Sequence, residues 1–363
     1  MNLPTPQDAV RDFFDWRYHA REFYENVSMH VLPEHPISLN FTNQTIKAQD
    51  SYVYGLILGN YNSKSNSSSV SLYNVSFPNR TSISFDKSKP NPEWGRISNT
   101  SKFSFKGRIY ACNLNSSNDI MAAVDNDLIY ISETSDTKIA LKNDQAKIIQ
   151  FLPGDSSMES FLCTRSNSVM FYKGPKCIGS LPFQISKFKR SILDLSIDPY
   201  NPQTALVCHG KVSINCIDIR DSSRTSIKLE DHVSSLAFAN HIPFMFAAGS
   251  LSGVIAFFDI RLPSAPICTI TAHDSEVTSL KWSVTSRDIV ASSSLDAAVA
   301  LWSLNEAKEA DPSAVFAHNG HVTPITAFDW CQDMPWTMAS VSEDNLFEIW
   351  TIAPSQIEDY LYP

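Results

Sequence analysis

The sequence predicts an all-β fold in which seven blades form a closed propeller, with one α-helix packed on its side. Two segments near the C-terminus repeat each other. Each has a histidine 23 residues before an aspartate and a tryptophan 6 residues after it: His273, Asp296 and Trp302, then His321, Asp344 and Trp350. Apolar residues also recur at intervals of 41 to 48 residues, at Ile131, Tyr172, Ile217, Phe258, Trp302 and Trp350.

This spacing is typical of the WD40 repeat, whose period is about 40–45 residues. Each recurring residue ends a short run of alternating apolar residues, which predicts a strand. An earlier pair of such runs, ending near Tyr73, raises the number of blades to seven. Inside a blade, polar side chains need hydrogen-bonding partners. We expect two such networks: His273, Ser294, Asp296 and Trp302, and His321, Ser342, Asp344 and Trp350.

The N-terminal residues 1–35 are expected to form a helix that docks on the last blade. Thr5 can cap its start and Pro6 suits the first helical position. Apolar residues then recur with nearly helical period as far as Val31, and Pro33 ends the pattern. The alternating segment 37–42 is predicted to be a strand that closes the last blade, with Ile37, Leu39 and Phe41 beside the repeat at 320–350. The propeller then spans 36–353, and 354–363 is a tail.

Composition narrows the class of protein. The 363 residues carry a net charge of −9, which argues against nonspecific binding to nucleic acid and suits basic partners such as histones. We also expect no direct recognition of nucleic-acid sequence. No apolar run is long enough for a membrane span, and the start lacks a signal-peptide pattern. The 7 cysteines are scattered, as in reduced intracellular proteins. Nucleophile, phosphate-loop and metal-ligand motifs are missing, so we expect no enzyme activity, no cofactor and no metal.

The segment 318–350, HNGHVTPITAFDWCQDMPWTMASVSEDNLFEIW, resembles the last blade of histone-binding WD40 proteins of the retinoblastoma-binding and MSI1-like family. The resemblance implies a non-catalytic scaffold of a chromatin-modifying or chromatin-assembly complex, located in the nucleus with some in the cytoplasm. It implies histones as partners: histone H4, held by its first helix in a groove between the N-terminal helix and the loop 305–317, and the tail of histone H3 on the top face.

The same resemblance assigns the groove residues. The apolar side would comprise Phe23, Tyr24, Val27, Phe316 and Ala317, and the acidic side would comprise Glu306, Glu309 and Asp311. The chain departs from the family here, because its acidic loop is short and Ala317 replaces a larger apolar residue. Both differences are expected to weaken the binding of histone H4 in this groove.

An alternative function follows from two consecutive blades that end in Asp-x-Arg, at Asp218 with Arg220 and at Asp259 with Arg261. These resemble the W-D-x-R box of substrate receptors for cullin-4 ubiquitin ligases. In that interpretation, the four side chains face a DDB1-like adaptor, with the planar arginine fork making directional bonds. Structural ion pairs at the ends of blades would give the same pattern, and a chromatin-directed ligase receptor could combine both functions.

Overall fold

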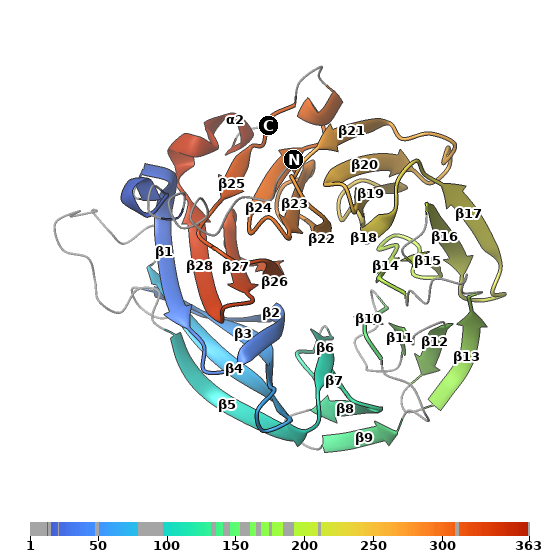
Figure 1. Ribbon diagram of the computed structural model, residues 1–363, viewed down its shortest axis with the longest axis horizontal. Coiled ribbons are helices and arrows are strands. Elements are labelled where there is room, and N and C mark those ends of the chain that lie inside the picture. The colour runs from blue at the N-terminus through green and yellow to red at the C-terminus, as the bar shows by residue number, and fades with distance from the viewer. Residues whose placement is uncertain are drawn as a thin grey trace.

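The computed structural model describes most of the chain. The described ranges are 13, 16–20, 22–47, 51–78, 97–115, 117–131, 136–140, 146–152, 160–164, 168–173, 176–183, 192–209, 212–308 and 312–361. Within them, the strands form seven four-stranded antiparallel sheets arranged as blades around a central axis (Figure 1). The all-β propeller predicted from the repeat is confirmed.

The blades follow one another in chain order, with the first strand of each nearest the axis (Figure 1). The first blade comprises β2 (His35–Lys47), β3 (Ser51–Asn62), β4 (Ser67–Pro78) and β5 (Ile97–Lys106). The next two comprise β6 (Ile109–Leu114), β7 (Ile120–Val124), β8 (Asp127–Ile131) and β9 (Asp136–Ala140), then β10 (Ile149–Phe151), β11 (Ser160–Thr164), β12 (Ser168–Lys173) and β13 (Lys176–Pro182).

Four further blades complete the ring. They comprise β14 (Asp194–Ile197), β15 (Thr204–Cys208), β16 (Ser213–Asp218) and β17 (Arg224–Lys228), then β18 (Val233–Phe238), β19 (Met245–Ser250), β20 (Val254–Asp259) and β21 (Cys268–Thr271). The penultimate blade comprises β22 (Val277–Trp282), β23 (Ile289–Ser294), β24 (Val299–Ser303) and β25 (Phe316–His318). The last blade comprises β26 (Ile325–Trp330), β27 (Thr337–Ser342), β28 (Leu346–Ile352) and, from the other end of the chain, β1 (Tyr24–Val31).

The last blade is closed by a different strand from the one predicted. β1 pairs with β28, from Tyr24 opposite Ile352 to Val31 opposite Leu346. The predicted strand 37–42 instead lies in β2, which pairs with β3 in the first blade. Its side chains Leu39 and Phe41 still pack against the last blade, in one buried cluster with Phe347 and Ile349 of β28. The prediction placed the segment beside the correct neighbour but in the wrong sheet.

The predicted helix is shorter than its apolar period suggested. The described residues 13, 16–20 and 22–23 are helical, and Tyr24 begins a strand. Val27 and Val31 extended the helical pattern, but in β1 their side chains are 37% and 80% exposed. Pairing with the free edge of β28 satisfies a row of backbone groups. That gain outweighs a weak local helical preference. The helix starts predicted at Thr5 and Pro6 lie outside the described residues.

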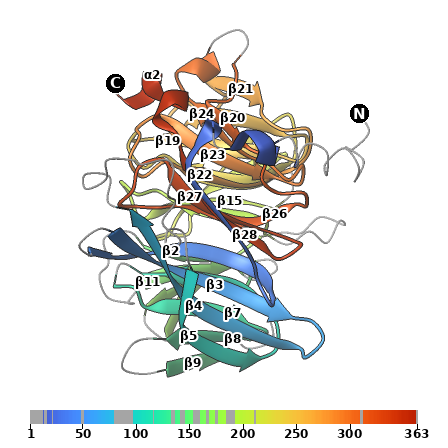
Figure 2. The ribbon, with the colours of Figure 1, turned by 90° about the vertical axis from the view of Figure 1, so that its left-hand side faces the viewer.

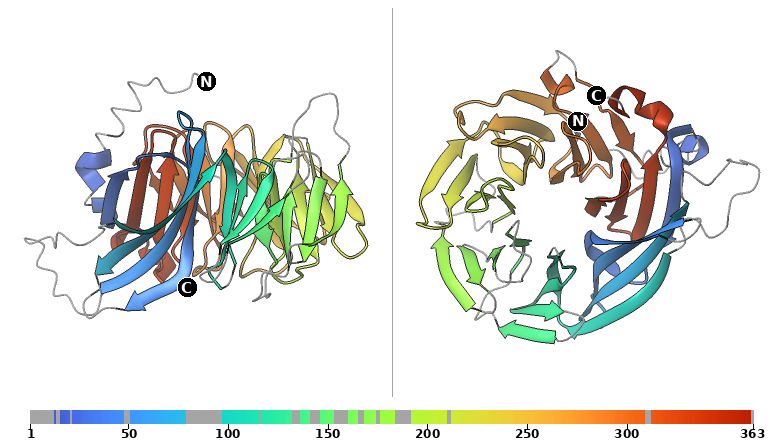
Figure 3. Two further views of the ribbon diagram at one scale, coloured as in Figure 1. Left: turned by 90° about the horizontal axis from the view of Figure 1, so that it is seen from below. Right: turned by 180° about the vertical axis from the view of Figure 1, so that it is seen from behind.

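The helical turns of the N-terminal segment contact the outer rim of the last two blades. Figure 2 shows them at the edge of the ring, near β1 and β28 and on the same side as α2. Figure 3 shows the strands of each blade crossing the thickness of the disc, with this segment on its side. Trp16 and Ala20 are buried in one cluster with Phe316, Trp350 and Ile352. The N-terminal segment is therefore part of the core of the last blade.

The predicted C-terminal tail also folds onto this rim. After β28 the chain forms η2 (Pro354–Gln356) and α2 (Glu358–Leu361), and a further short helix, η1 (Glu306–Lys308), follows β24. Ile357 is buried in the cluster that contains Trp350. None of the helices in the described part of the chain is long and apolar enough to cross a membrane.

Candidate functional site

A groove of about 590 Å³ lies on the rim, between the N-terminal helical segment and β25. Its walls come from the N-terminal helix, β1, the segment leading through β25 and the C-terminal turn η2. The lining residues are Trp16, His19, Phe23, Tyr24, Val315, Phe316, Ala317, Asn319 and Gln356. Apolar and aromatic side chains form most of this lining, with polar groups from only a few positions.

The groove contains four of the eight residues predicted for it: Phe23, Tyr24, Phe316 and Ala317. Phe23 is 37% exposed and Ala317 is exposed, whereas Tyr24 and Phe316 are buried and form the floor. Val27 is partly exposed on β1 but is not among the lining residues.

Of the three residues predicted for the acidic side of the groove, the structure describes only Glu306. Glu306 begins η1 and accepts a hydrogen bond from the Tyr360 hydroxyl of α2. It is not among the lining residues. Glu309 and Asp311 lie outside the described residues. The acidic wall therefore stays a prediction.

The floor of the groove is held by stacked aromatic rings. The Tyr24 ring meets Phe316 edge-on at a centroid distance of 5.3 Å, and Phe316 stacks on Trp350 at 6.0 Å. Trp16 packs edge-on against Tyr24 at 5.7 Å. Such pairs contribute about 0.5–1.5 kcal/mol each beyond the burial of their area. Because Trp350 is the tryptophan that ends the last repeat and is buried in the core of the last blade, the floor of the groove rests directly on that core.

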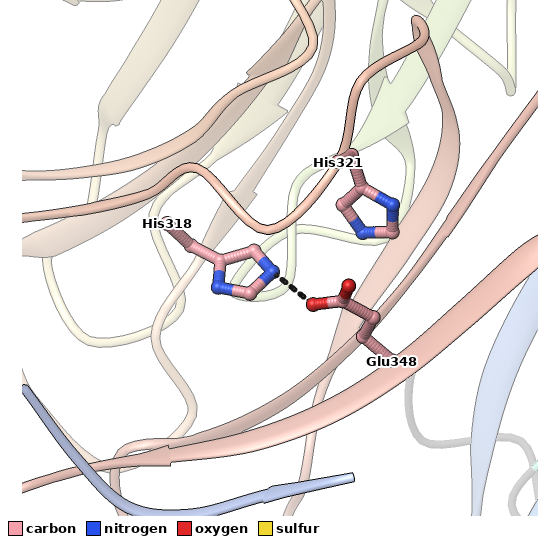
Figure 4. Close-up of side chains that lie close together, drawn as sticks. All are labelled: His318, His321 and Glu348. Atoms are coloured by element: carbon pink, nitrogen blue, oxygen red, sulfur yellow. Dashed lines mark ion pairs between the residues drawn. The ribbon is translucent and has the colours of Figure 1, made fainter. Parts of the chain in front are cut away.

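A buried chain of polar contacts runs beneath this floor. Trp16 Nε1 donates a hydrogen bond to the Tyr24 hydroxyl oxygen over 2.9 Å, and that oxygen lies 2.7 Å from His318 Nδ1. On the other side of the ring, His318 Nε2 lies 2.9 Å from a carboxylate oxygen of Glu348 (Figure 4). The His318 ring also stacks on Trp350 at 4.4 Å. The groove wall is thereby connected to an acid in the interior of the blade.

His318, His321 and Glu348 form a buried cluster whose ligand-type atoms lie within 4.8 Å of one another (Figure 4). Burial raises the pKa of Glu348 to about 7, and burial lowers the pKa of His318 to about 3 and that of His321 to about 4. Gly320 makes room for it, because a Cβ there would lie 2.3 Å from a Glu348 oxygen. The three groups have the residue types of a metal site.

The hydrogen bonds of His321 argue against that role. Its Nε2 lies 2.8 Å from Ser340 Oγ and its Nδ1 lies 2.9 Å from Ser342 Oγ. A histidine ligand needs one free nitrogen lone pair, and both nitrogens here are engaged. Only His318 and Glu348 are left as donors, and two ligands are fewer than structural or catalytic metal sites use.

The two blade networks predicted from the repeat are present, but each is centred on another serine. Trp302 Nε1 donates to Ser292 Oγ over 2.9 Å, and Ser292 Oγ lies 2.7 Å from His273 Nε2. His273 Nδ1 is 2.9 Å from Asp296. In the last blade, Ser340 takes the place of Ser292 between the tryptophan and the histidine.

The predicted Ser294 lies two residues beyond the central position. Its hydroxyl oxygen accepts a hydrogen bond from the backbone N–H of Asp296 and does not join histidine to tryptophan. Ser342, in contrast, continues the network of the last blade: it contacts His321 and donates to Asp344 over 2.6 Å. The repeat spacing identified the ends of the networks, whereas strand register decided which serine lies between them.

Replacing Ser292 with alanine is expected to lower the free energy of unfolding by about 1–3 kcal/mol, because two buried groups, on Trp302 and His273, lose their partner. Ser294→Ala is the matched control, since it removes one hydroxyl from the same buried strand and leaves this junction intact. Denaturant unfolding of both variants measures the difference. Equal losses would contradict the central role of Ser292.

The two Asp-x-Arg boxes form internal ion pairs. Arg220 contacts Asp218 at 2.5 Å, and Arg261 contacts Asp259 at 2.6 Å. Hydrogen bonds from these arginines hold the pKa of both aspartates below the usual value. The arginine side chains remain 67% and 62% exposed, and Arg261 also lies over the Phe244 ring. The contacts fit the structural interpretation, and adaptor binding stays a prediction.

Several residues of the site could not be predicted from the WD40 repeat motif. Trp16, His19, Asn319 and Gln356 complete the lining of the groove, and Glu348 lies beneath it. His318, the first histidine of the H-N-G-H opening, could have indicated a buried polar partner such as Glu348. His321 already belongs to the blade network, so a second buried histidine beside it needs a partner of its own.

Comparison with known proteins agrees with the fold and the repeat. The WD domain, G-beta repeat family matches residues 264–303 and 312–351. A histone acetyltransferase type B subunit 2 from Debaryomyces hansenii is 24% identical over 370 residues, which cover 93% of this chain and 89% of the relative. One from Yarrowia lipolytica is 39% identical over 61 residues, 17% of this chain and 14% of the relative.

A third similarity is to the histone-binding protein MSI1 of Saccharomyces cerevisiae, which is 25% identical over 166 residues, 44% of this chain and 38% of that protein. Together with the seven sheets and the blade networks, these similarities extend from the repeats to nearly the whole chain. The chain therefore contains WD40 repeats and is similar over nearly its whole length to a histone acetyltransferase type B subunit 2, and over part of its length to the histone-binding protein MSI1.

Proposed function

We propose that this chain is a non-catalytic WD40 scaffold of a nuclear chromatin-modifying or chromatin-assembly complex, and that it binds histones. The names of its relatives support this proposal, since they are a subunit of a histone acetyltransferase and a histone-binding protein. The net charge of −9 favours association with basic partners. The groove on the rim gives the proposal a specific surface.

The groove is proposed to hold an amphipathic helix, namely the first helix of histone H4. Its volume of about 590 Å³ and its aromatic floor suit a row of apolar side chains presented at helical spacing. Phe23, 37% exposed at the edge, offers an anchor that a partner would cover. His19, Asn319 and Gln356 supply hydrogen-bonding groups around it. This lining is the observation that carries the proposal.

Phe23→Ala is expected to weaken binding of a peptide with the sequence of the first H4 helix by about 1–3 kcal/mol, because it removes an exposed aromatic anchor. Isothermal titration of the full-length protein measures the change. Tyr18→Ala is the matched control: Tyr18 is 83% exposed on the same segment and does not line the groove. Equal affinities for wild type and Phe23→Ala would place the partner elsewhere.

Phe316 is a poorer position than Phe23 for testing the groove by substitution. It is only 7% exposed and stacks on Trp350, so Phe316→Ala would lower stability as well as affinity. A loss of binding in that variant would not separate the two effects, and Phe23 provides the cleaner measurement.

Two further parts of the proposal rest on resemblance. The tail of histone H3 is proposed to bind the top face of the propeller, where the loops between strands offer exposed polar groups. The chain is proposed to act in the nucleus, with some in the cytoplasm.

A further inference from the structure

The turns between the first and second strands of four consecutive blades share one backbone contact. In each, the residue just before the second strand accepts a hydrogen bond at its carbonyl oxygen from an N–H at the end of the third strand. From the fourth blade to the last, these residues are Gln203, Phe244, Asp288 and Trp336, with distances of 2.8, 2.9, 2.8 and 3.1 Å. The four positions are therefore structurally equivalent, although their side chains differ.

Two of the four residues are aromatic and have the same unusual backbone conformation. Phe244 has a φ of 67° and Trp336 a φ of 61°. This left-handed region is rare for bulky residues, and such strain tends to persist at functional sites. Each residue also follows a proline, at positions 243 and 335. The two aromatic side chains therefore leave their turns from matching backbone positions.

The last blade covers its aromatic residue with the C-terminal segment. Trp336 is 4% exposed and lies in one buried cluster with Ile357. The ring of Tyr360, from α2, lies at a centroid distance of 6.3 Å from the Trp336 ring. This cover is possible because β1 supplies the fourth strand of the blade, so the chain beyond β28 is free to form η2 and α2.

The fifth blade leaves its aromatic residue uncovered, because the chain continues from β20 into β21 of the same sheet (Figure 1). Phe244 is 44% exposed, and the guanidinium carbon of Arg261 lies 4.5 Å from the centroid of its ring. Leu262, beside Arg261 in the chain, is 73% exposed. Tyr200 is 50% exposed, and its hydroxyl donates to the carbonyl oxygen of Asn240 over 3.1 Å, which places it beside this turn.

We propose that Phe244 is the centre of a docking site for a short helix of a partner protein, which covers it as η2 and α2 cover Trp336. The occupant presents an aliphatic residue and, three positions later, an aromatic residue, as the C-terminal segment does with Ile357 and Tyr360. Burial of these side chains on an exposed ring is a common source of binding energy in helix recognition. None of the residues around Phe244 lines the groove on the rim, so the proposal does not depend on histone binding.

Arg261 indicates the charge of the occupant. Its hydrogen bonds to Asp259 come from Nε and Nη2, and its side chain is still 62% exposed. The N–H groups of Nη1 can therefore donate to a partner, and a carboxylate is the strongest acceptor for a guanidinium. The occupant then carries an acidic residue beside its two apolar anchors. In the C-terminal segment, Glu358 and Asp359 lie between the anchors and are exposed.

The probe is a synthetic peptide of residues 353–363, because it contains the aliphatic, acidic and aromatic residues in the required order. It is titrated into the full-length ¹⁵N-labelled protein at constant pH and salt. The Nε–Hε resonance of Arg261 and the backbone amide of Met245 report on the turn around Phe244. The backbone amide of Thr337 reports on the equivalent turn of the last blade.

Phe244→Asn is the test variant, because it removes the ring while asparagine tolerates a left-handed backbone. Ile178→Asn is the matched control, since it removes an apolar side chain that is 60% exposed on β13 of another blade. A second peptide, with Glu358→Gln and Asp359→Asn, tests the charge of the occupant. Arg261→Gln is the corresponding change in the protein.

Wild type and Ile178→Asn are expected to bind the first peptide with a Kd of about 1 mM, as suits so short a helix, and to shift Arg261 and Met245 but not Thr337. Phe244→Asn is expected to weaken binding roughly tenfold or more. The uncharged peptide is expected to bind wild type roughly threefold more weakly than the first. Arg261→Gln is expected to remove that difference.

Three results would overturn the docking site. They are a response confined to Thr337, equal binding by wild type and Phe244→Asn, and no response of Arg261 or Met245 in wild type. Equal binding of the two peptides to wild type would overturn the acidic character of the partner. Should Phe244→Asn fail to fold, a peptide with Tyr360→Ala provides the second test: if it binds wild type as tightly as the first peptide, the aromatic anchor is wrong.

Discussion

A chain that lacks residues 1–32 is expected to lose cooperative folding and to associate in solution. The deletion removes β1, which covers the outer edge of β28 from Tyr24 to Val31. An uncovered edge strand presents unpaired backbone groups that pair readily with other chains. The deletion also removes Trp16 and Tyr24 from the buried cluster around Trp350. Losing two buried aromatic side chains destabilises by about 3–5 kcal/mol each, comparable with the total stability of many domains.

Thermal unfolding and size-exclusion chromatography of the truncated protein provide the measurement. Val31→Ala is the control, because this side chain lies on the same strand but is 80% exposed, and its loss should change stability by no more than about 0.5 kcal/mol. A synthetic peptide of residues 13–34 is expected to restore the monomer by strand addition. A truncated chain that melts at the wild-type temperature would show that the last blade does not need β1.

The positions of the blades could be predicted because the repeat imposes one period on the whole chain. The recurring apolar positions from Ile131 to Trp350 lie on the third strand of six successive sheets. Even Ile131, whose side chain differs from that of Trp350, lies on the equivalent strand of its own sheet. Burial on that strand requires an apolar side chain but no particular one, so spacing was a better guide than residue identity.

The closure of the ring was predicted less well because it depends on a competition between partners distant in sequence. The segment 24–31 carries apolar residues at helical spacing, yet it also satisfies the edge of β28. The periodicity of a segment indicates its local preference for helix or strand, but it does not indicate whether the segment pairs with a distant strand. Because β1 occupies that edge, the alternating segment that includes Leu39 and Phe41 is the inner strand of the first blade.

The candidate site was only partly predictable for the same reason. Phe23 and Phe316 were found by resemblance, whereas nothing in the sequence indicated that Glu348 is buried beneath the groove. A glutamate inside a strand is usually exposed, and here both its neighbours, Phe347 and Ile349, are buried as well. Its partner His318 is 30 residues away in sequence. Only the packing of β25 against β28 brings them together.

Tyr24→Ala is expected to lower the free energy of unfolding by about 3–5 kcal/mol, the largest effect of any single substitution considered. The Tyr24 side chain is 5% exposed and contacts the rings of Trp16, Phe316, His318 and Trp350. Its removal leaves a cavity at the junction of the N-terminal segment with the last blade. Denaturant unfolding followed by tryptophan fluorescence measures the loss.

Tyr24→Phe separates packing from hydrogen bonding at this position. The ring contacts persist, but Trp16 Nε1 and His318 Nδ1 lose the hydroxyl that joins them, which should lower stability by about 1–3 kcal/mol. If Tyr24→Phe were as stable as wild type, the polar chain would contribute nothing to folding and the aromatic contacts alone would fix the segment. If it were as unstable as Tyr24→Ala, the hydroxyl rather than the ring would hold the groove wall on the blade.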